Sequence, residues 1–376
     1  MKTVFQISLL FIILVSCKSE KEKQFEKYII GEWNFDKQVE SKKHVDNSQI
    51  IEEPPSPFFA NLGGFIFKDN GTVIDKVGFF DFSEGKSREE RKITYKGDST
   101  NYKLDNDSLK ILDPINNSWN NYKIISITKD TLKLQKNDGY YLKYFKPKYE
   151  LNADETFDKI IISSSGCYGT CAISNIEFDR NGKVFYFGEK YNTINGFYKS
   201  TISNIEYNKI ENSFKKANIS KLENNYSARV TDLNTITITF VKNNKIIKTI
   251  SDYGSQAPSE LIMVYRKVMY KYQNLKLSEL KIKKDIPLST MFSLAKREKL
   301  LFLEDSERFL LLNEILNAKQ VQLNFKENYN LTIFENDDKD IVIKTDGRFF
   351  KYGTKTYDIG YNFIEINNLE KRDENH

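Results

Sequence analysis

The fold of the first part of the chain is decided by three successive runs: Leu132-Lys133-Leu134, Asn137-Asp138-Gly139 and Tyr140-Tyr141-Leu142-Lys143-Tyr144-Phe145. Polar and apolar residues alternate on both sides of an Asp-Gly turn signal, which is typical of a β-hairpin with one buried face. Similar runs lie upstream at Phe65-Ile66-Phe67, Lys92-Ile93-Thr94-Tyr95, Leu109-Lys110-Ile111 and Tyr122-Lys123-Ile124-Ile125. About eight short strands at regular spacing predict an antiparallel β-barrel over residues 31–150.

The first predicted strand of this barrel contains Gly31-Glu32-Trp33. Together with the closing run Tyr140–Phe145, this motif resembles the lipocalin-like domains of Bacteroidetes lipoproteins. The resemblance implies that the indole of Trp33 plugs the base of the barrel, and contact with a ligand is the alternative role. A barrel of this size can also enclose one small ligand.

The second part, residues 151–280, is predicted to be an α+β domain with an antiparallel sheet. Strand-like runs include Lys159–Ile162, Val184–Phe187 and Ile236–Phe240, and the pair Ser203 and Glu206 forms a capping box for one helix. A second helix begins at Pro258, and its apolar stripe predicts core positions at Leu261, Val264, Tyr265 and Val268.

The run Gly166-Cys167-Tyr168-Gly169-Thr170-Cys171, with Thr231-Asp232 further on, resembles a bacterial domain of unknown function. Ala172 stands where that family usually has proline, and the family implies no activity. In an exported chain, we expect Cys167 and Cys171 to form a local disulfide that holds the turn after a strand. Redox exchange is the alternative, although redox enzymes place Cys-x-x-Cys at a helix start.

The third part, residues 281–367, is predicted to be a helix packed on a small antiparallel sheet. Asp305 or Ser306 is the expected cap of a helix that carries Phe309, Leu312 and Ile315. Alternating runs follow at Val321–Phe325, Leu331–Phe334 and Ile341–Ile343. The charged tail, residues 368–376, is predicted to be disordered.

The N-terminus indicates export. Lys2 precedes an apolar run of about a dozen residues, too short for a helix of about 20 residues that spans a bilayer. Leu14-Val15-Ser16-Cys17 resembles the cleavage site of lipoprotein signal peptides. The resemblance implies that residues 1–16 are removed and Cys17 is acylated, which anchors a tether, residues 17–30, in the outer membrane on its periplasmic or surface face. An ordinary secretory signal with an incidental cysteine is the alternative.

The composition narrows the possible functions. Two histidines, His44 and His376, and three cysteines offer no cluster for a metal, and we expect neither a cofactor nor a His-based catalytic triad. With 57 basic and 52 acidic residues interspersed, no nucleic-acid partner is expected. The leading hypothesis is a non-enzymatic lipoprotein that binds a small apolar ligand or an envelope component. The alternatives are an assembly protein of the cell envelope and a hydrolase that uses two carboxylates.

Overall fold

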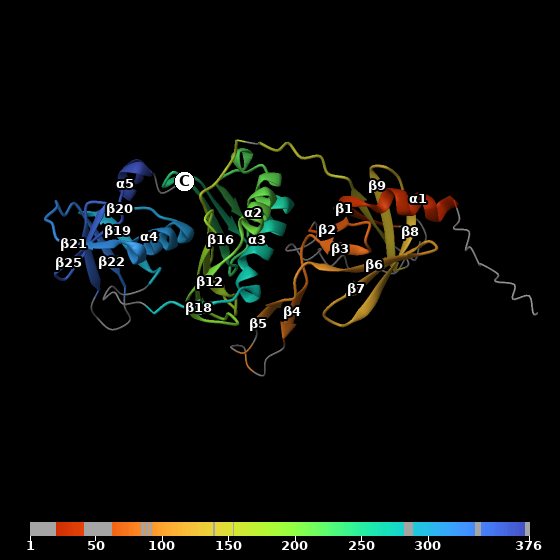
Figure 1. Cartoon of the computed structure of the whole chain (residues 1–376), viewed down its shortest axis with the longest axis horizontal. Coiled ribbons are helices and arrows are strands. Elements are labelled where there is room, and N and C mark those ends of the chain that lie inside the picture. Colours follow the sequence, from red (N-terminus) through yellow and green to blue (C-terminus); the bar gives the residue numbers. More distant parts are fainter. Residues whose placement is uncertain are drawn as a thin grey trace, which may run out of the picture.

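The computed structural model describes residues 20–40, 62–83, 87, 90, 92–137, 140–152, 154–281, 289–334 and 340–372. These residues form three main β-sheets that lie in a row, with helices between them (Figure 1). The predicted signal peptide, Cys17, His44 and His376 lie outside the described residues.

The first sheet is a closed barrel of eight antiparallel strands in the order β1-β10-β9-β8-β7-β6-β3-β2. Its core contains Trp33, Val73, Leu109 and Leu132, all without measurable exposure. The antiparallel barrel predicted from the alternating runs is confirmed, but the run Lys92–Tyr95 lies outside it, in a separate two-stranded sheet. Its strands are β1 (Gly31–Glu40), β2 (Gly64–Phe67), β3 (Thr72–Asp75), β6 (Ser99–Asp105), β7 (Ser108–Asp113), β8 (Ser118–Ile127), β9 (Thr131–Asn137) and β10 (Tyr140–Phe145).

Helix α1 (Glu20–Ile29) packs against the barrel. Phe25 and Ile29, four residues apart on one helix face, are buried in the same cluster as Trp33. The indole Nε1 of Trp33 donates a hydrogen bond of 2.7 Å to the carbonyl of Ile29. The prediction that residues 17–30 are only a tether is therefore wrong for α1, because its apolar face completes the barrel core.

The second sheet has the order β15-β17-β16-β11-β12-β13-β14-β18, antiparallel except for the parallel pair β15 and β17. Helices α2 (Asn204–Lys216) and α3 (Ser259–Met269) pack on one face and share its core. The other elements are β11 (Lys159–Ser164), β12 (Ile173–Asp179), β13 (Lys183–Lys190), β14 (Gly196–Thr201), η2 (Ile219–Lys221), β15 (Asn225–Ser227), β16 (Thr235–Lys242), β17 (Lys245–Tyr253), η3 (Lys271–Asn274) and β18 (Ser278–Glu279).

The third sheet has the order β20-β19-β22-β23-β24-β25-β21, and α4 (Asp305–Asn317) lies between it and the second sheet (Figure 1). Ile161, Val241 and Ile246 of the second sheet belong to the same buried cluster as α4. The strands are β19 (Phe292–Lys296), β20 (Lys299–Leu301), β21 (Lys319–Val321), β22 (Tyr329–Ile333), β23 (Ile341–Thr345), β24 (Phe349–Tyr352) and β25 (Lys355–Asp358). The last two sheets therefore share a core, although the sequence places them in separate parts.

The C-terminal segment is more ordered than the sequence predicts. After α5 (Phe363–Ile366), a 3₁₀ turn, η4 (Leu369–Lys371), buries Leu369 completely, and Arg372 forms an ion pair of 2.8 Å with Glu307. The prediction of a disordered tail from residue 368 is therefore wrong as far as Arg372. Among the described residues, no helix is long and apolar enough to cross a membrane.

Candidate functional site

A hairpin inserted into the barrel positions one side of the candidate site. Strands β4 (Phe80–Ser83) and β5 (Lys92–Tyr95) leave the barrel between β3 and β6 and reach the second sheet's domain. Phe80 and Tyr95 are buried in the core of that domain, and the ring of Phe80 lies 5.4 Å from that of Tyr270. The side chain of Gln273 accepts a hydrogen bond of 2.7 Å from the amide of Tyr95 and donates one of 2.8 Å to the carbonyl of Ile93. The hairpin thus joins the two domains.

Between this hairpin, the barrel and the second sheet's domain lies a cavity of about 630 Å³, which we call the interdomain cleft. Its volume falls within the range of small-molecule sites, about 300–1,000 Å³. The hairpin side contributes mainly apolar side chains, from Val77, Phe79, Phe80, Phe82 and Ile93. The barrel contributes Asp113, Ile115 and Asn120 from the ends of β7 and β8.

The wall from the second domain combines the end of its sheet with α3. Ser164, Cys171, Ala172, Asn234 and Ile236 come from the end of β11, the cysteine loop and the start of β16. Helix α3 and the residues after it add Tyr265, Arg266, Met269 and Tyr270. Aromatic and aliphatic side chains therefore make up most of the lining of the cleft, together with a few polar groups, as is usual for ligand sites.

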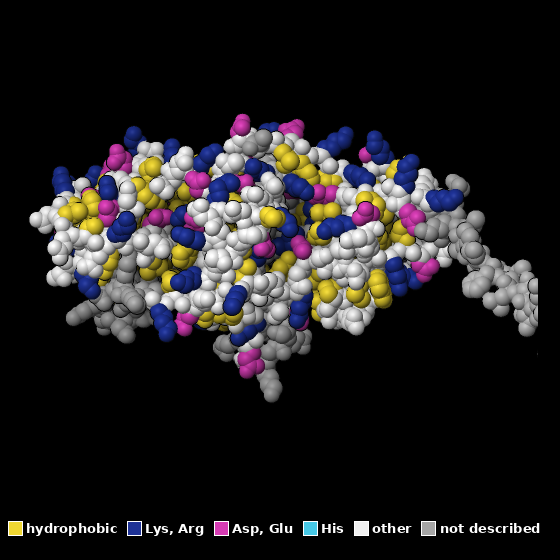
Figure 2. All heavy atoms as spheres, viewed as in Figure 1, with side chains coloured by type: hydrophobic (Ala, Val, Ile, Leu, Met, Phe, Trp, Pro, Cys, Tyr) yellow, Lys and Arg dark blue, Asp and Glu magenta, His cyan; other side chains and the backbone are white. Residues whose placement is uncertain are grey.

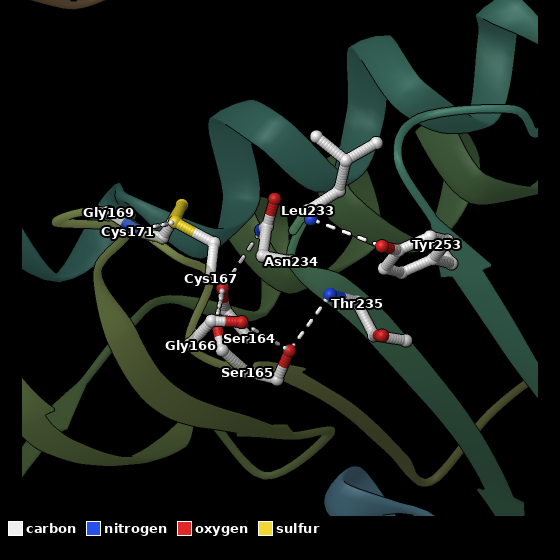
Figure 3. Close-up of a disulfide and its surroundings, with 10 residues drawn as sticks. All are labelled: Ser164, Ser165, Gly166, Cys167, Gly169, Cys171, Leu233, Asn234, Thr235 and Tyr253. Atoms are coloured by element: carbon white, nitrogen blue, oxygen red, sulfur yellow. Dashed lines mark hydrogen bonds between the residues drawn. A yellow bond between two sulfur atoms is a disulfide. The ribbon is translucent and has the colours of Figure 1, made fainter. Parts of the chain in front are cut away.

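The cysteine loop forms part of this wall. The Sγ atoms of Cys167 and Cys171 are 2.00 Å apart and form a disulfide, so the structure brings the two predicted residues together. The amide of Tyr168 donates to the carbonyl of Asp232 (3.2 Å), and the hydroxyl of Ser165 accepts from the amide of Thr235 (2.8 Å). Figure 3 shows the loop beside the segment Leu233–Thr235. The two motifs of the resemblance, far apart in the sequence, therefore meet at one end of the sheet.

A buried carboxylate connects the sheet to α3 behind this wall. Asp252, without measurable exposure, accepts hydrogen bonds from the amides of Gln256 (2.7 Å) and Ala257 (3.1 Å) and from the hydroxyl of Tyr265 (2.8 Å). Burial raises the pKa of Asp252. Tyr265 was predicted as a core residue, and it is buried, but it also lines the cleft.

Polar contacts fix the barrel against the helices of the second domain. Glu32 of β1 binds Lys76 (2.7 Å) and Lys216 of α2 (2.6 Å). Burial alone would raise the pKa of Glu32, but the hydrogen bonds from these two lysines lower it to about 2. Lys267 of α3 pairs with Asp98 at 2.9 Å. The two sides of the cleft are therefore tied together by charge pairs.

The interior of the barrel is occupied by its own side chains. Ring centroids lie 5.7 Å apart in the pair Phe35 and Tyr144, 5.6 Å apart in Phe65 and Tyr144, and 4.9 Å apart in Phe67 and Tyr102. These ring pairs and the apolar side chains around them build the core of the barrel. Trp33 belongs to this packed interior, and Gly31 precedes it with φ +113°, a conformation that favours glycine.

Two carboxylates at the start of α4 are relevant to the hydrolase alternative. Burial and the neighbouring Glu307 raise the pKa of Glu304 to about 7. However, Glu307 is held by Arg372, with two contacts of 2.8 Å, and by Thr249 at 2.7 Å. It also accepts a hydrogen bond of 3.2 Å from the amide of Glu304, the residue that caps the N-terminus of α4. A structural role therefore explains the contacts of Glu307: this residue caps the start of α4 and holds the C-terminal segment in place.

Few charged side chains line the interdomain cleft. Of the described residues that line the cleft, Asp113 alone is acidic and Arg266 alone is basic. The described His, Cys, Asp and Glu residues form no group that could hold a metal ion. Lys, Arg, Asp and Glu are interspersed over the face shown in Figure 2.

Sequence reasoning missed the hairpin wall and Arg266. A usable signal was present in Phe79-Phe80-Asp81-Phe82, where adjacent aromatic residues depart from the alternation of a barrel strand. Adjacent aromatics require partners on both faces, and the second domain supplies one of them.

A domain of unknown function, DUF6438, is found at residues 158–271, where the chain matches the model of that family. The match begins just before β11 and includes Cys167, Cys171, Thr231 and Asp232, the residues on which the resemblance rested. No curated protein matches the chain.

Proposed function

We propose that this protein is an exported, lipid-anchored and non-enzymatic binding protein that holds a small apolar ligand in the interdomain cleft. The observation that carries the proposal is the cavity of about 630 Å³ with its mainly apolar walls. The signal-peptide pattern and Cys17 support placement at the outer membrane, on the periplasmic or the surface face. The lipocalin-like motif Gly31-Glu32-Trp33 supports a Bacteroidetes lipoprotein origin.

The test uses N-phenyl-1-naphthylamine, a neutral fluorescent probe, with the mature full-length protein. Phe82 lines the cleft and is 63% exposed, so Phe82→Ser should leave the fold intact. The loss of its apolar contact should weaken binding of the probe by about tenfold.

Phe145→Ser is the matched control, because Phe145 is 40% exposed at the end of β10 and does not line the cleft. It should bind the probe as the unmodified protein does. The proposal fails if the unmodified protein does not bind the probe, or if the two variants bind it equally well.

The assembly alternative has its own support in the C-terminal domain. Met291, Leu300 and Phe334 are apolar and exposed there, and β20 is an edge strand of the sheet. Exposed apolar side chains at a sheet edge are typical of contact with another chain. Absence of probe binding in the cleft would favour this alternative.

A further inference from the structure

Among the described residues, two charged side chains line the interdomain cleft, those of Asp113 and Arg266, and they make different contacts. The carboxylate of Asp113 accepts hydrogen bonds from the amide of Ile115 (2.8 Å) and from the side chain of Asn116 (2.9 Å). These contacts shape the turn between β7 and β8, so Asp113 has a structural role at the barrel side of the cleft.

The basic group lies on the opposite side. Arg266 follows Tyr265 on α3, and its guanidinium carbon lies 5.4 Å from the centre of the Phe80 ring, which also lines the cleft. A guanidinium has five N–H donors in a planar fork that matches carboxylate and phosphate groups. It can therefore bind an acidic ligand in addition to its contacts within the protein.

The surroundings of Arg266 favour such a ligand. Burial lowers the pKa of Arg266, which means that its charge is less well solvated here than in water. The phenol groups of Tyr265 and Tyr270 offset part of this effect. An anion beside the guanidinium would add a favourable contact to those that Arg266 already makes, because opposite charges attract more strongly in a low-dielectric site.

The rest of the cleft suits an apolar body. Phe79, Phe80 and Phe82 of the hairpin face a cavity that Ile115 of the barrel and Met269 of α3 also line. We therefore propose that the ligand is a single-chain amphiphile whose acidic head, a carboxylate or a phosphate, binds Arg266 while its apolar body lies against the aromatic residues of the hairpin. This proposal rests on the proposed function, since it names the class of ligand for the same cleft.

The test is competition against the fluorescent probe by three compounds of equal chain length: dodecanoate, dodecyl phosphate and dodecan-1-ol. The unmodified protein should bind at least one of the two anions about 10- to 100-fold more tightly than the alcohol, the range of a hydrogen bond to a charged group. The comparison of the two anions distinguishes a carboxylate head from a phosphate head.

Arg266→Gln should remove this preference and still bind dodecan-1-ol, whereas Arg266→Lys should retain a preference for the anions. Arg297→Gln is the control, because Arg297 lies in the turn between β19 and β20, away from the cleft. Equal binding of all three compounds by the unmodified protein would overturn the proposal that the ligand has an acidic head, and it would leave the proposed function unchanged. This comparison does not depend on the folding of any variant. A failure to bind the probe and all three compounds would instead refute the proposed function itself.

Discussion

At the scale of single residues, Asp75 connects the barrel to the cleft. It ends β3, and its carboxylate accepts hydrogen bonds from the amides of Val77 (2.8 Å) and Gly78 (3.1 Å), two residues of the cleft wall. Burial raises the pKa of Asp75 to about 6, above its usual value of 3.8, although both amides and Lys267 act in the opposite direction. The folded protein therefore holds this proton more tightly than the unfolded chain.

This difference predicts a pH dependence of stability. The contribution of Asp75 is fully present below pH 4 and is lost as the pH rises through 6, because the folded state must then bury a charged carboxylate. Asp75→Asn keeps an acceptor for both amides and should remove this loss, which amounts to about 1–3 kcal/mol. Calorimetric unfolding from pH 4 to pH 8 measures this loss of stability in the unmodified protein and in the variant.

The control is Asp130→Asn, at an exposed position in the turn before β9. It should retain the pH dependence of the unmodified protein. Parallel pH profiles for Asp75→Asn and the unmodified protein would contradict the prediction.

At the scale of elements, the β4–β5 hairpin decides whether the cleft exists. Its entry depends on Gly78, which has φ +85° and no room for a side chain: an added Cβ would lie 2.8 Å from the ring of Tyr95 and 3.3 Å from Lys267. At the exit, Gly97 has φ +93°, and an added Cβ would meet nothing within 4 Å. The two glycines have the same conformational requirement, but only Gly78 also has a steric one.

This contrast predicts that Gly78→Ala displaces the hairpin and Gly97→Ala does not. Both substitutions cost about 1 kcal/mol for the left-handed backbone, and Gly78→Ala adds the clash with Tyr95. Gly78→Ala should therefore unfold at a lower temperature than Gly97→Ala and bind N-phenyl-1-naphthylamine more weakly. Equal midpoints and equal affinities would show that the hairpin tolerates a side chain at its entry.

At the scale of the whole molecule, a buried charge cluster attaches the C-terminal domain to the second sheet. Lys159 of β11 contacts Glu177 of β12 at 3.1 Å and Glu314 of α4 at 2.6 Å. Asn313 of α4 donates a hydrogen bond of 3.0 Å to Glu177, which is almost completely buried. Burial alone would lower the pKa of Lys159, but the two glutamates raise it. Lys159 is therefore the shared partner of both glutamates, and each member of the cluster depends on the others.

Lys159→Met should destabilise the protein by about 3–5 kcal/mol, because it leaves Glu177 buried without its cation. Lys221→Met is the control: Lys221 and its partner Glu150 are 68% and 82% exposed, and exposed pairs contribute little. Calorimetry measures the stability, and limited proteolysis between the second and third sheets detects loosening of α4. Similar unfolding temperatures for the two variants would be evidence against this role of the cluster.

The sequence by itself determined the local elements. Alternation and turn residues predicted the barrel strands, and the capping box with Ser203 correctly predicted the start of α2, because these signals act between neighbours in the chain. Of the apolar stripe predicted as core in α3, Leu261, Tyr265 and Val268 are buried, and Val264 is partly buried against the same core. At the start of α4, where Asp305 or Ser306 was expected as the cap, the cap is Glu304, because several acidic residues there compete for that position.

Only the tertiary structure decided how these elements meet. The apolar faces of α1 and the hairpin find their partners far away in the sequence, in the barrel core and in the second domain. The shared core around α4 and the interdomain cleft likewise arise from residues that are distant in the sequence. A periodic pattern shows that a face is buried and leaves open which surface covers it, so the candidate site became visible only once the three sheets were in place.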